Sequence, residues 1–206
     1  MELMEAVDKR RTVRDFLSKP VPEEVIKKAL YAGLKAPSYN HQKQVYFTLV
    51  KDPALRLGII AAEGMKDEVS ETSKAALKRE YEKLAQEMYM YAIPRQNRML
   101  KEAPEVLVVS YKPKKAFAQS RTPADLNCHA AVWACIENIL LSLAEDDVFG
   151  TTMVPDNTPA IKEVLGIPKE LEIAVLLPFG YKSPDARIIP QKEVSVEEAL
   201  HIDRWS

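Results

Sequence analysis

The stretch "ADLNCHAAVWACIENILLSLAED", residues 124–146, is the longest helical pattern in this chain of 206 residues and largely decides its fold. Its apolar residues cover nearly the whole circumference of a helix, so we expect it to be buried on most sides. In a chain of this size, one side of such a helix often faces a partner subunit. Cys128 and Cys135 would lie two turns apart on one face, too far apart for a disulfide. We interpret His129 as a satisfied, partly buried histidine.

Two apolar runs of strand length flank this helix in the sequence. "EVLVVSY" (105–111) and "LEIAVLLPFGY" (171–181) are typical of buried central strands. "QVYFTLVK" (44–51) is rich in β-branched and aromatic residues and predicts another strand. Residues 150–155 predict a short strand or turn. Helices are predicted at 2–10, 22–35 and 54–62, and from a cap at Asp156 to Gly166.

Helices and strands in this order predict an α+β fold, with a sheet of four to five strands surrounded by helices and residues 1–206 forming one domain. Residues 66–100 form a charged, helix-prone excursion, in which Tyr81, Leu84, Met88 and Tyr91 are spaced as one stripe before a break at Ile93-Pro94. The tail, residues 182–206, is polar and long enough to reach a neighbouring subunit.

Composition excludes several classes of function. The net charge of −1, from 29 basic and 30 acidic residues, argues against general nucleic-acid binding. The chain has no CxxC pair and no HExxH, so we expect no metal site. It has no GxGxxG and no P-loop, so a bound phosphate would have to be held by side chains. Without an apolar leader or a run of 18 apolar residues, we expect a soluble, cytoplasmic protein with no membrane partner.

The stretch "DKRRTVRDF", residues 8–16, places Arg10, Arg11 and Arg14 within five positions. On a helix, Arg10 and Arg14 would lie one turn apart on a shared face, while Arg11 would point elsewhere. The planar fork of arginine suits phosphate oxygens, so the stretch could form an anion pocket. The alternative is a solvated charge run at a helix end.

A second polar stretch, "KAPSYNHQKQ" (35–44), follows the predicted second helix. Ser38, Asn40, His41 and Gln42 carry short hydroxyl, amide and imidazole groups that can read the edge of a heterocycle from a rigid loop. The alternative is an ordinary polar turn, because Ser, Asn and Pro favour turns for local reasons. Nucleophilic catalysis finds little support, since no acid is placed to orient His41 beside Ser38.

Taken together, these stretches resemble the FMN-dependent nitroreductase family. In that family an R-R-S-x-R-x-F pattern is followed by A-P-S-x-x-N-x-Q, and this chain has "RRTVRDF" followed by "APSYNHQ". "ENILLSLAEDDVFGTTM", "LLPFGY" and "VEEALHIDRW" extend the similarity over essentially the whole chain.

The resemblance implies an antiparallel-rich sheet wrapped by helices in an intertwined homodimer, with two FMN molecules in the interface. It implies that NADH or NADPH gives a hydride to the flavin, and that an organic acceptor such as a nitroaromatic or quinone then takes two electrons at the same site. Alternatives remain open: a reductive dehalogenase, a flavin-cleaving enzyme, an oxidase, or a flavin-binding protein without turnover.

The resemblance also assigns residues. Arg10, Arg11, Thr12 and Arg14 would hold FMN, with Arg10 toward the phosphate and Arg14 at the pyrimidine edge of the ring, and no catalytic side chain is needed. The other implied contacts are Pro37, Ser38 and Asn40 from the second subunit, Gln42, backbone N–H groups of Gly150 and Thr151, and Lys192 or Arg187 near the phosphate.

This sequence departs from the family pattern in several places. The S-x-x-N spacing is one residue shorter here, Lys43-Gln44 replaces Pro-Trp, and Asp147 replaces the first glycine before the threonine. We further hypothesise that the excursion 66–100 forms a lid over the flavin. Tyr81, Met88, Tyr89 or Tyr91 would then line the acceptor pocket; the alternative is that the stripe is simply the helix's packing face.

Overall fold

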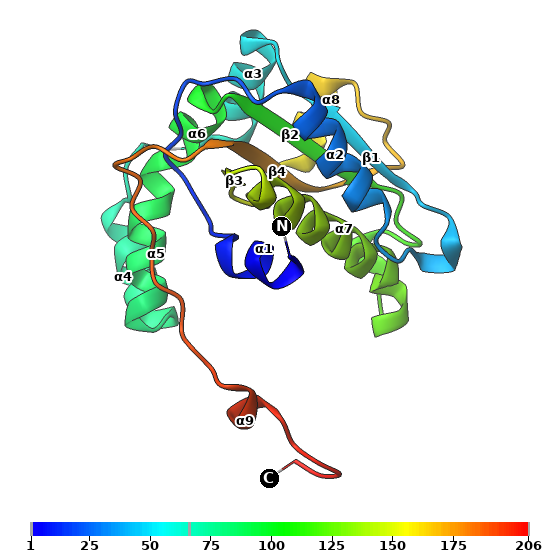
Figure 1. Ribbon diagram of the computed structural model, residues 1–206. Coiled ribbons are helices and arrows are strands. Elements are labelled where there is room, and N and C mark those ends of the chain that lie inside the picture. The colour runs from blue at the N-terminus through cyan, green and yellow to red at the C-terminus, as the bar shows by residue number, and fades with distance from the viewer. Residues whose placement is uncertain (1, 66, 206) are drawn as a thin grey trace.

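The computed structural model describes residues 2–65 and 67–205, and its centre is an antiparallel sheet of four strands in the described chain (Figure 1). The strand order is β1-β2-β4-β3, with every neighbouring pair antiparallel. This confirms the predicted α+β class and the strands predicted at 44–51, 105–111 and 171–181, whereas the short strand lies just before the strand or turn predicted at 150–155. The bounds are β1 (Val45–Leu49), β2 (Glu105–Tyr111), β3 (Val148–Gly150) and β4 (Glu172–Tyr181).

Helices cover both faces of the sheet because the central strands are apolar on both sides. Leu107, Val109 and Tyr111 of β2 join one core, whereas Val106 and Val108 join the other. This alternation is what the two-residue period of a strand requires. Helices α2 (Glu23–Leu34) and α7 (Asn127–Glu145) pack on the first core, and α3 (Pro53–Glu63), α6 (Gln96–Glu102) and α8 (Thr158–Leu165) pack on the second.

Helix α7 lies against α2 at close range. A Cβ atom on Gly33 of α2 would come within 2.7 Å of Ile139 Cγ1, so only glycine allows this approach. The buried residues of α7 form a single stripe, which means that the expected burial on most sides is wrong for one chain. By length and composition Pro123–Glu145 could also cross a membrane, but here the helix serves as a core helix of a globular domain. Cys128 and Cys135 are both free thiols.

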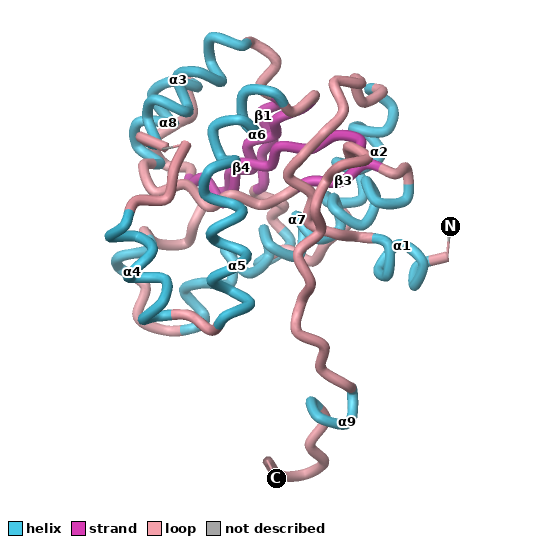
Figure 2. Tube along the Cα trace, turned by 90° about the vertical axis from the view of Figure 1, so that its left-hand side faces the viewer, coloured by secondary structure: helices cyan, strands magenta, loops and turns pink. Residues whose placement is uncertain are grey.

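The excursion is a set of short helices that projects beyond the sheet (Figure 2). It contains α4 (Glu71–Glu80), α5 (Lys83–Ala92) and a 3₁₀ turn, Ile93–Arg95, that leads into α6. The single predicted stripe is therefore wrong at Tyr81, whose extended backbone (φ −129°) ends α4. The predicted break at Ile93-Pro94 is confirmed, since α5 ends at Ala92 and Pro94 lies in the first turn of the 3₁₀ segment, where a helix tolerates proline. Residue 66, where the predicted excursion starts, lies outside the described residues.

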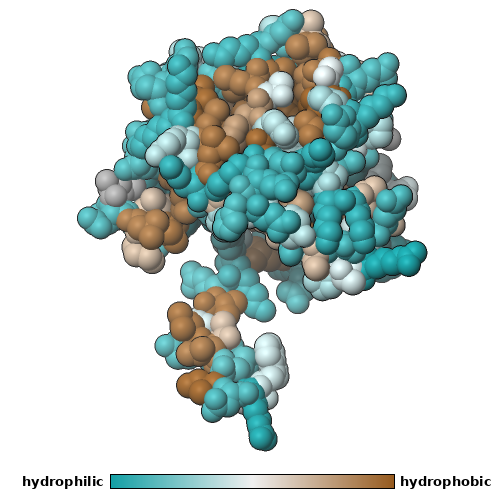
Figure 3. Space-filling model, turned by 90° about the vertical axis from the view of Figure 1, so that its right-hand side faces the viewer, coloured by the Kyte–Doolittle hydropathy of each residue, from teal (hydrophilic) through white to brown (hydrophobic). Residues whose placement is uncertain are grey.

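The tail first lies along the body, where the Ser183 N–H donates to the Asp15 carbonyl and Arg187 pairs with Glu87, and the remainder then projects away from the molecule (Figures 1 and 3). It carries a short helix, α9 (Val196–Ala199), and otherwise has little regular structure. Apolar side chains gather on it without cover from the rest of the chain; the largest are Val194, Val196, Leu200, Ile202 and Trp205, which is 88% exposed.

Helix α8 begins one residue later than predicted. Its N-cap is Asn157, whose side chain accepts a hydrogen bond from the Ala160 N–H at 3.5 Å, so the cap predicted at Asp156 is wrong. The Asp156 N–H instead donates to Glu63 at 2.9 Å. The helix ends at Gly166, as predicted, and the left-handed φ of 65° there explains the glycine.

Candidate functional site

The arginine-rich stretch is extended rather than helical. Helix α1 (Leu3–Lys9) ends before it, and Thr12 forms a parallel bridge with Gly150 at the end of β3. The Val13 N–H donates to the Gly150 carbonyl at 3.2 Å, and Val13 is fully buried. The prediction that Arg10 and Arg14 share one face of a helix is therefore wrong. In an extended chain alternate side chains share one side, and Thr12 and Arg14 do line one cavity, whereas Arg10 pairs with Glu137 on α7.

The end of β3 places two threonines beside this stretch. A Cβ on Gly150 would lie 3.0 Å from both the Pro178 carbonyl oxygen and Phe179 Cβ, so glycine is needed for close packing on β4. The Thr151 N–H donates to the Pro178 carbonyl at 3.2 Å. The expectation that this N–H faces a ligand is therefore wrong, and the side-chain hydroxyl group is the donor that Thr151 can offer to a ligand.

Asp147 occupies the place where the family pattern has a glycine. Its φ of 59° lies in the left-handed region, which glycine adopts freely and which aspartate tolerates better than most residues. Its carboxylate forms an ion pair with Lys9 Nζ at 2.7 Å, which ties α1 to the turn before β3. The left-handed backbone at Asp147 is thus accommodated by a residue that also contributes an ion pair.

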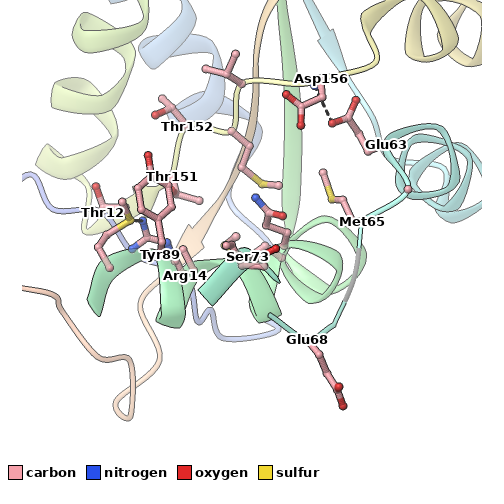
Figure 4. A pocket seen from close by; sticks show the side chains of 18 of the residues that line it. Thr12, Arg14, Glu63, Met65, Glu68, Ser73, Tyr89, Thr151, Thr152 and Asp156 are labelled. Carbon is pink, nitrogen blue, oxygen red and sulfur yellow. Dashed lines mark hydrogen bonds between the residues drawn. The ribbon is translucent and has the colours of Figure 1, made fainter. Parts of the chain in front are cut away.

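A cavity of about 820 Å³, the main cavity, opens where these segments meet the excursion (Figure 4). Thr12, Arg14, Thr151 and Thr152 lie at one end of it, with Tyr89 of α5 beside them. Its volume is within the usual range for small-molecule sites. Four methionines contribute much of its apolar lining: Met65, Met88, Met99 and Met153.

Among the described residues that line this cavity, Arg14 is the cation. Among the described residues it forms no ion pair, and its Nη2 lies 3.5 Å from Met88 Sδ. Burial lowers the pKa of its guanidinium; the nearby Tyr91 acts in the opposite direction and Arg95 in the same direction. Because arginine stays charged in proteins, a half-buried guanidinium without a carboxylate partner leaves its charge uncompensated. A ligand that brings negative charge to Arg14 would relieve this cost.

The other predicted arginines lie outside the main cavity. Arg10 Nε lies 3.2 Å from Glu137 Oε1 on α7, and Arg11 is exposed and donates to the Arg10 carbonyl at 2.7 Å. Arg187 forms an ion pair with Glu87, and Lys192 is exposed on the tail. A single chain therefore does not assemble the predicted phosphate site.

Residues 37–42 form a turn of their own, away from the main cavity. Ser38 Oγ accepts a hydrogen bond from the Lys43 N–H at 3.2 Å, and Pro37, Asn40 and Gln42 are exposed. Asn40 and its neighbour His41 both have positive φ angles, 49° and 57°. In one chain this is the polar turn of the alternative interpretation, and the contact from a second subunit stays a prediction.

The structure therefore brings together Thr12, Arg14 and Thr151, with Gly150 packed behind them. Met88 and Tyr89 line the main cavity as predicted. Tyr81 instead packs on the Tyr89 ring, with centroids 5.0 Å apart. Sequence reasoning did not assign several other lining residues, among them Met65, Met99, Thr152 and Met153. Isolated methionines look like core residues, and although Thr152 and Met153 end the quoted stretch "ENILLSLAEDDVFGTTM", nothing in that stretch assigns them a role.

His129 is a structural histidine, as predicted. The Trp133 indole N–H donates to its Nε2 at 3.0 Å, so the imidazole proton sits on Nδ1, 3.1 Å from the Tyr111 hydroxyl oxygen. Burial lowers the pKa of this imidazole, which favours the neutral form. Within residues 2–65 and 67–205 no group of three or more His, Cys, Asp or Glu side chains could hold a metal ion.

Comparison with known proteins adds a family. Residues 7–181 match the family model described as the nitroreductase family. An iodotyrosine deiodinase of Thermotoga neapolitana is 27% identical over 195 residues, which are 94% of this chain and 96% of the relative. A putative NADH dehydrogenase/NAD(P)H nitroreductase of Archaeoglobus fulgidus is 24% identical and covers 99% of both chains. A crystal structure of oxidised iodotyrosine deiodinase bound to FMN and 3-iodo-L-tyrosine superposes with a TM-score of 0.73 at 24% identity, over 95% of this chain and 97% of the other.

Proposed function

This chain belongs to the nitroreductase family, and we propose that it is an FMN-dependent oxidoreductase that takes a hydride from NADH or NADPH and passes two electrons to a small organic acceptor. The observation that carries the proposal is Arg14, a half-buried guanidinium without a carboxylate partner among the described residues, at the end of a cavity of about 820 Å³.

The residues at this end of the cavity fit the ring of FMN. The hydroxyl groups of Thr12, Thr151 and Thr152 can donate to or accept from the polar edge of a heterocycle. Methionine side chains adapt their shape to flat apolar ligands, and four of them line part of the remaining space, together with the carboxylates of Glu63, Glu68 and Asp156. The carboxylates lie away from Arg14, so the cavity combines a cationic, polar end for orientation with a body of apolar and acidic side chains (Figure 4).

FMN, when bound, supplies the hydride and electron transfer. Arg14 would hold its positive charge at the pyrimidine edge of the ring, where negative charge increases on reduction, and would so favour the reduced state. Met88 and Tyr89 of α5 would exclude water from the ring, since α5 lies over the polar end of the cavity (Figure 4). No general acid or base is required of the protein.

The proposal includes a homodimer that completes the site. The predicted phosphate ligand Arg10 and the turn 37–42 do not reach the main cavity of their own chain, and the tail with Lys192 projects from the body. Helix α7 buries only one stripe, which leaves apolar surface for a second copy. A second copy could therefore bring Pro37, Ser38, Asn40 and Gln42 to the flavin.

Anaerobic reduction tests the proposed activity. Purified protein loaded with FMN should lose its yellow colour when NADH or NADPH is added, and the colour should return on addition of a nitroaromatic or a quinone. A flavin that stays oxidised with both dinucleotides, but bleaches with a chemical reductant, would contradict the oxidoreductase and leave a passive flavin-binding protein.

A second candidate is reductive dehalogenation of a halogenated aromatic compound. It is favoured by the iodotyrosine deiodinase at 27% identity over nearly the full length of both chains. In such a reaction two electrons and a proton replace the carbon–halogen bond by carbon–hydrogen and release halide. Incubation of the reduced protein with 3-iodotyrosine distinguishes the candidates: iodide release coupled to flavin oxidation supports a dehalogenase, whereas a nitroaromatic that alone restores the colour supports the first candidate.

A further inference from the structure

A second cavity of about 550 Å³ adjoins the main cavity and is rich in arginine. The two cavities share Arg14 and Met99 in their walls. The second cavity is formed by the chain just after Arg14, by α5 to α6, and by the start of the tail. Its charged lining consists of four guanidinium groups, on Arg14, Arg95, Arg98 and Arg187, and three carboxylates, on Asp15, Glu102 and Asp185.

The carboxylate of Asp15 interacts with several donors. Its carboxylate accepts a hydrogen bond from the Tyr91 hydroxyl at 2.5 Å and forms an ion pair with Arg98. Arg95 Nε lies 3.5 Å from the same carboxylate, but it is buried and makes no hydrogen bond within the described chain. One carboxylate therefore serves two arginines, and a buried donor is left without an acceptor, which carries a desolvation cost.

Tyr91 gathers further positive charge at the same place. Arg95 Cζ lies 3.7 Å from the centroid of its ring, and Arg187 Cζ lies 5.6 Å from it. The face of an aromatic ring attracts cations, but this attraction is weaker than a charge-assisted hydrogen bond to an anion. An acceptor with negative charge would compensate these guanidinium groups better than the ring does.

The arginines of this cavity are accessible to a ligand. The side chains of Arg98 and Arg187 are 47% and 55% exposed. The ion pair between Arg187 and Glu87 lies at the surface, where such pairs contribute little and can exchange partners. A phosphate or carboxylate group can therefore enter without the loss of a buried interaction.

We propose that the second cavity is an anion subsite, which holds a phosphate or carboxylate group of the molecule that exchanges electrons in the main cavity. This inference rests on the proposed function. The guanidinium fork binds phosphate and carboxylate oxygens with the same geometry, so the group could belong to the dinucleotide or to the acceptor. The shared wall at Arg14 and Met99 connects the two cavities, so one ligand can occupy both.

The subsite is separate from the predicted site for the FMN phosphate. That phosphate is expected beside Arg10, whereas the second cavity begins at Arg14 and continues to Phe16. Because the chain is extended between Arg10 and Arg14, these two ends lie far apart along the stretch. An anion in the second cavity would thus lie beyond the ring end of the flavin.

Equilibrium binding to the oxidised, FMN-loaded protein tests the subsite. Four ligands form two matched pairs, NADP⁺ with NAD⁺ and benzoate with benzamide, and each is titrated by its effect on the flavin absorption spectrum. In Arg98→Gln and in Arg187→Gln we expect the Kd of NADP⁺ or of benzoate, which carries more negative charge than the other member of its pair, to rise about tenfold, as for the loss of one charge-assisted hydrogen bond. The Kd of the other member should change less than twofold. An effect on NADP⁺ identifies a phosphate, and an effect on benzoate identifies a carboxylate.

Lys101→Gln is the matched control, because Lys101 is an exposed cation on the same helix as Arg98 and lines neither cavity. Unchanged preference in both pairs, with FMN retained, would overturn the subsite and leave the proposed function standing. Loss of FMN in Arg98→Gln but not in Lys101→Gln would overturn it too, because the arginines would then belong to the cofactor site. Wild-type protein that binds no FMN would instead overturn the proposed function, and this inference with it.

Discussion

At the scale of single residues, Arg14 carries most of the functional argument. Its charge faces a cavity and has no carboxylate partner among the described residues. We therefore expect Arg14 to contribute favourable energy only when a ligand is bound. Replacement of Arg14 by alanine should raise the Kd for FMN by about tenfold to a hundredfold, as expected for a hydrogen bond to a charged group. The reduction potential of the bound flavin should fall, because the positive charge that favours the reduced ring is lost.

Titration of the FMN-free protein, followed by fluorescence quenching of the flavin, measures the first effect. Arg79→Ala is a suitable control, because Arg79 is an exposed cation that pairs with Glu80 on α4, away from both cavities. If Arg14→Ala left both the Kd and the potential unchanged, the assignment of Arg14 to the flavin ring would be wrong.

His129 predicts how stability depends on pH. Its folded-state pKa lies below the usual value of about 6.5 because burial disfavours the charged form. The unfolded chain therefore binds a proton there before the folded chain does. The contribution of neutral His129 to the free energy of unfolding is fully present above about pH 6.5. It is lost as the pH falls toward the lower folded-state pKa.

Urea unfolding at a series of pH values tests this dependence. The free energy of unfolding should fall more steeply with decreasing pH in the wild type than in His129→Gln. His41→Asn, at an exposed position whose left-handed φ asparagine tolerates, should behave like the wild type. Equal slopes for wild type and His129→Gln would mean that His129 is not held neutral by the fold.

At the scale of elements, the contact between α5 and the arginine-rich stretch supports the hypothesis that the excursion forms a lid. Tyr91 at the end of α5 donates to Asp15, the residue next to Arg14. Tyr91→Phe removes this bond but keeps the ring, so it should loosen α5 over the main cavity. We expect FMN to dissociate several times faster and bound flavin to become more accessible to a soluble quencher, since one hydrogen bond to a charged group contributes about 1.5–3 kcal/mol.

Stopped-flow dilution of the loaded protein would give the dissociation rate. Tyr31→Phe, on the exposed side of α2, provides the control. Equal dissociation rates and equal quenching in Tyr91→Phe and wild type would indicate that the tyrosine stripe of α5 only packs the helix, which is the alternative interpretation of this segment.

The elements differ in how well the sequence predicts them. Strand β2 appears at its predicted bounds because it is a continuous apolar run, a signal that is purely local. The extended form of residues 10–16 is not predictable in this way, since it depends on the bridge between Thr12 and the distant Gly150. The break at Tyr81 likewise follows no Gly or Pro signal, as the sequence there is uniformly helix-prone.

The candidate site shows the same division. The motifs in the sequence correctly predicted three residues at the polar end of the main cavity: Thr12, Arg14 and Thr151. They could be predicted because contacts with a polar ligand edge require particular residue types. Of the methionine lining only Met88 was predicted, because Met65 and Met153 come from separate loops and only the fold brings them together. The direction of the Thr151 N–H was predicted wrongly, since pairing with the Pro178 carbonyl depends on the register of β3 on β4.

At the scale of the whole molecule, the exposed tail predicts a homodimer. Leu200 and Ile202 are 60% and 78% exposed, and burial of such side chains against a second chain would stabilise association by about 1.5–3 kcal/mol each. The double variant Leu200→Ser/Ile202→Ser should therefore weaken the dimer and, with it, FMN retention.

Multi-angle light scattering across a range of protein concentrations measures this directly. Glu193→Ser/Arg204→Ser changes two exposed polar residues of the same tail and should stay dimeric. A wild-type monomer that still retains FMN would contradict both the homodimer and the site shared between subunits.

The central claim is that this fold holds FMN at the cavity beside Arg14, and the flavin content of the purified protein tests it most directly. The visible absorption spectrum, measured after removal of free flavin, should show about one FMN per chain, either as isolated or after incubation with added FMN. A colourless protein that retains no FMN after such incubation would contradict the account.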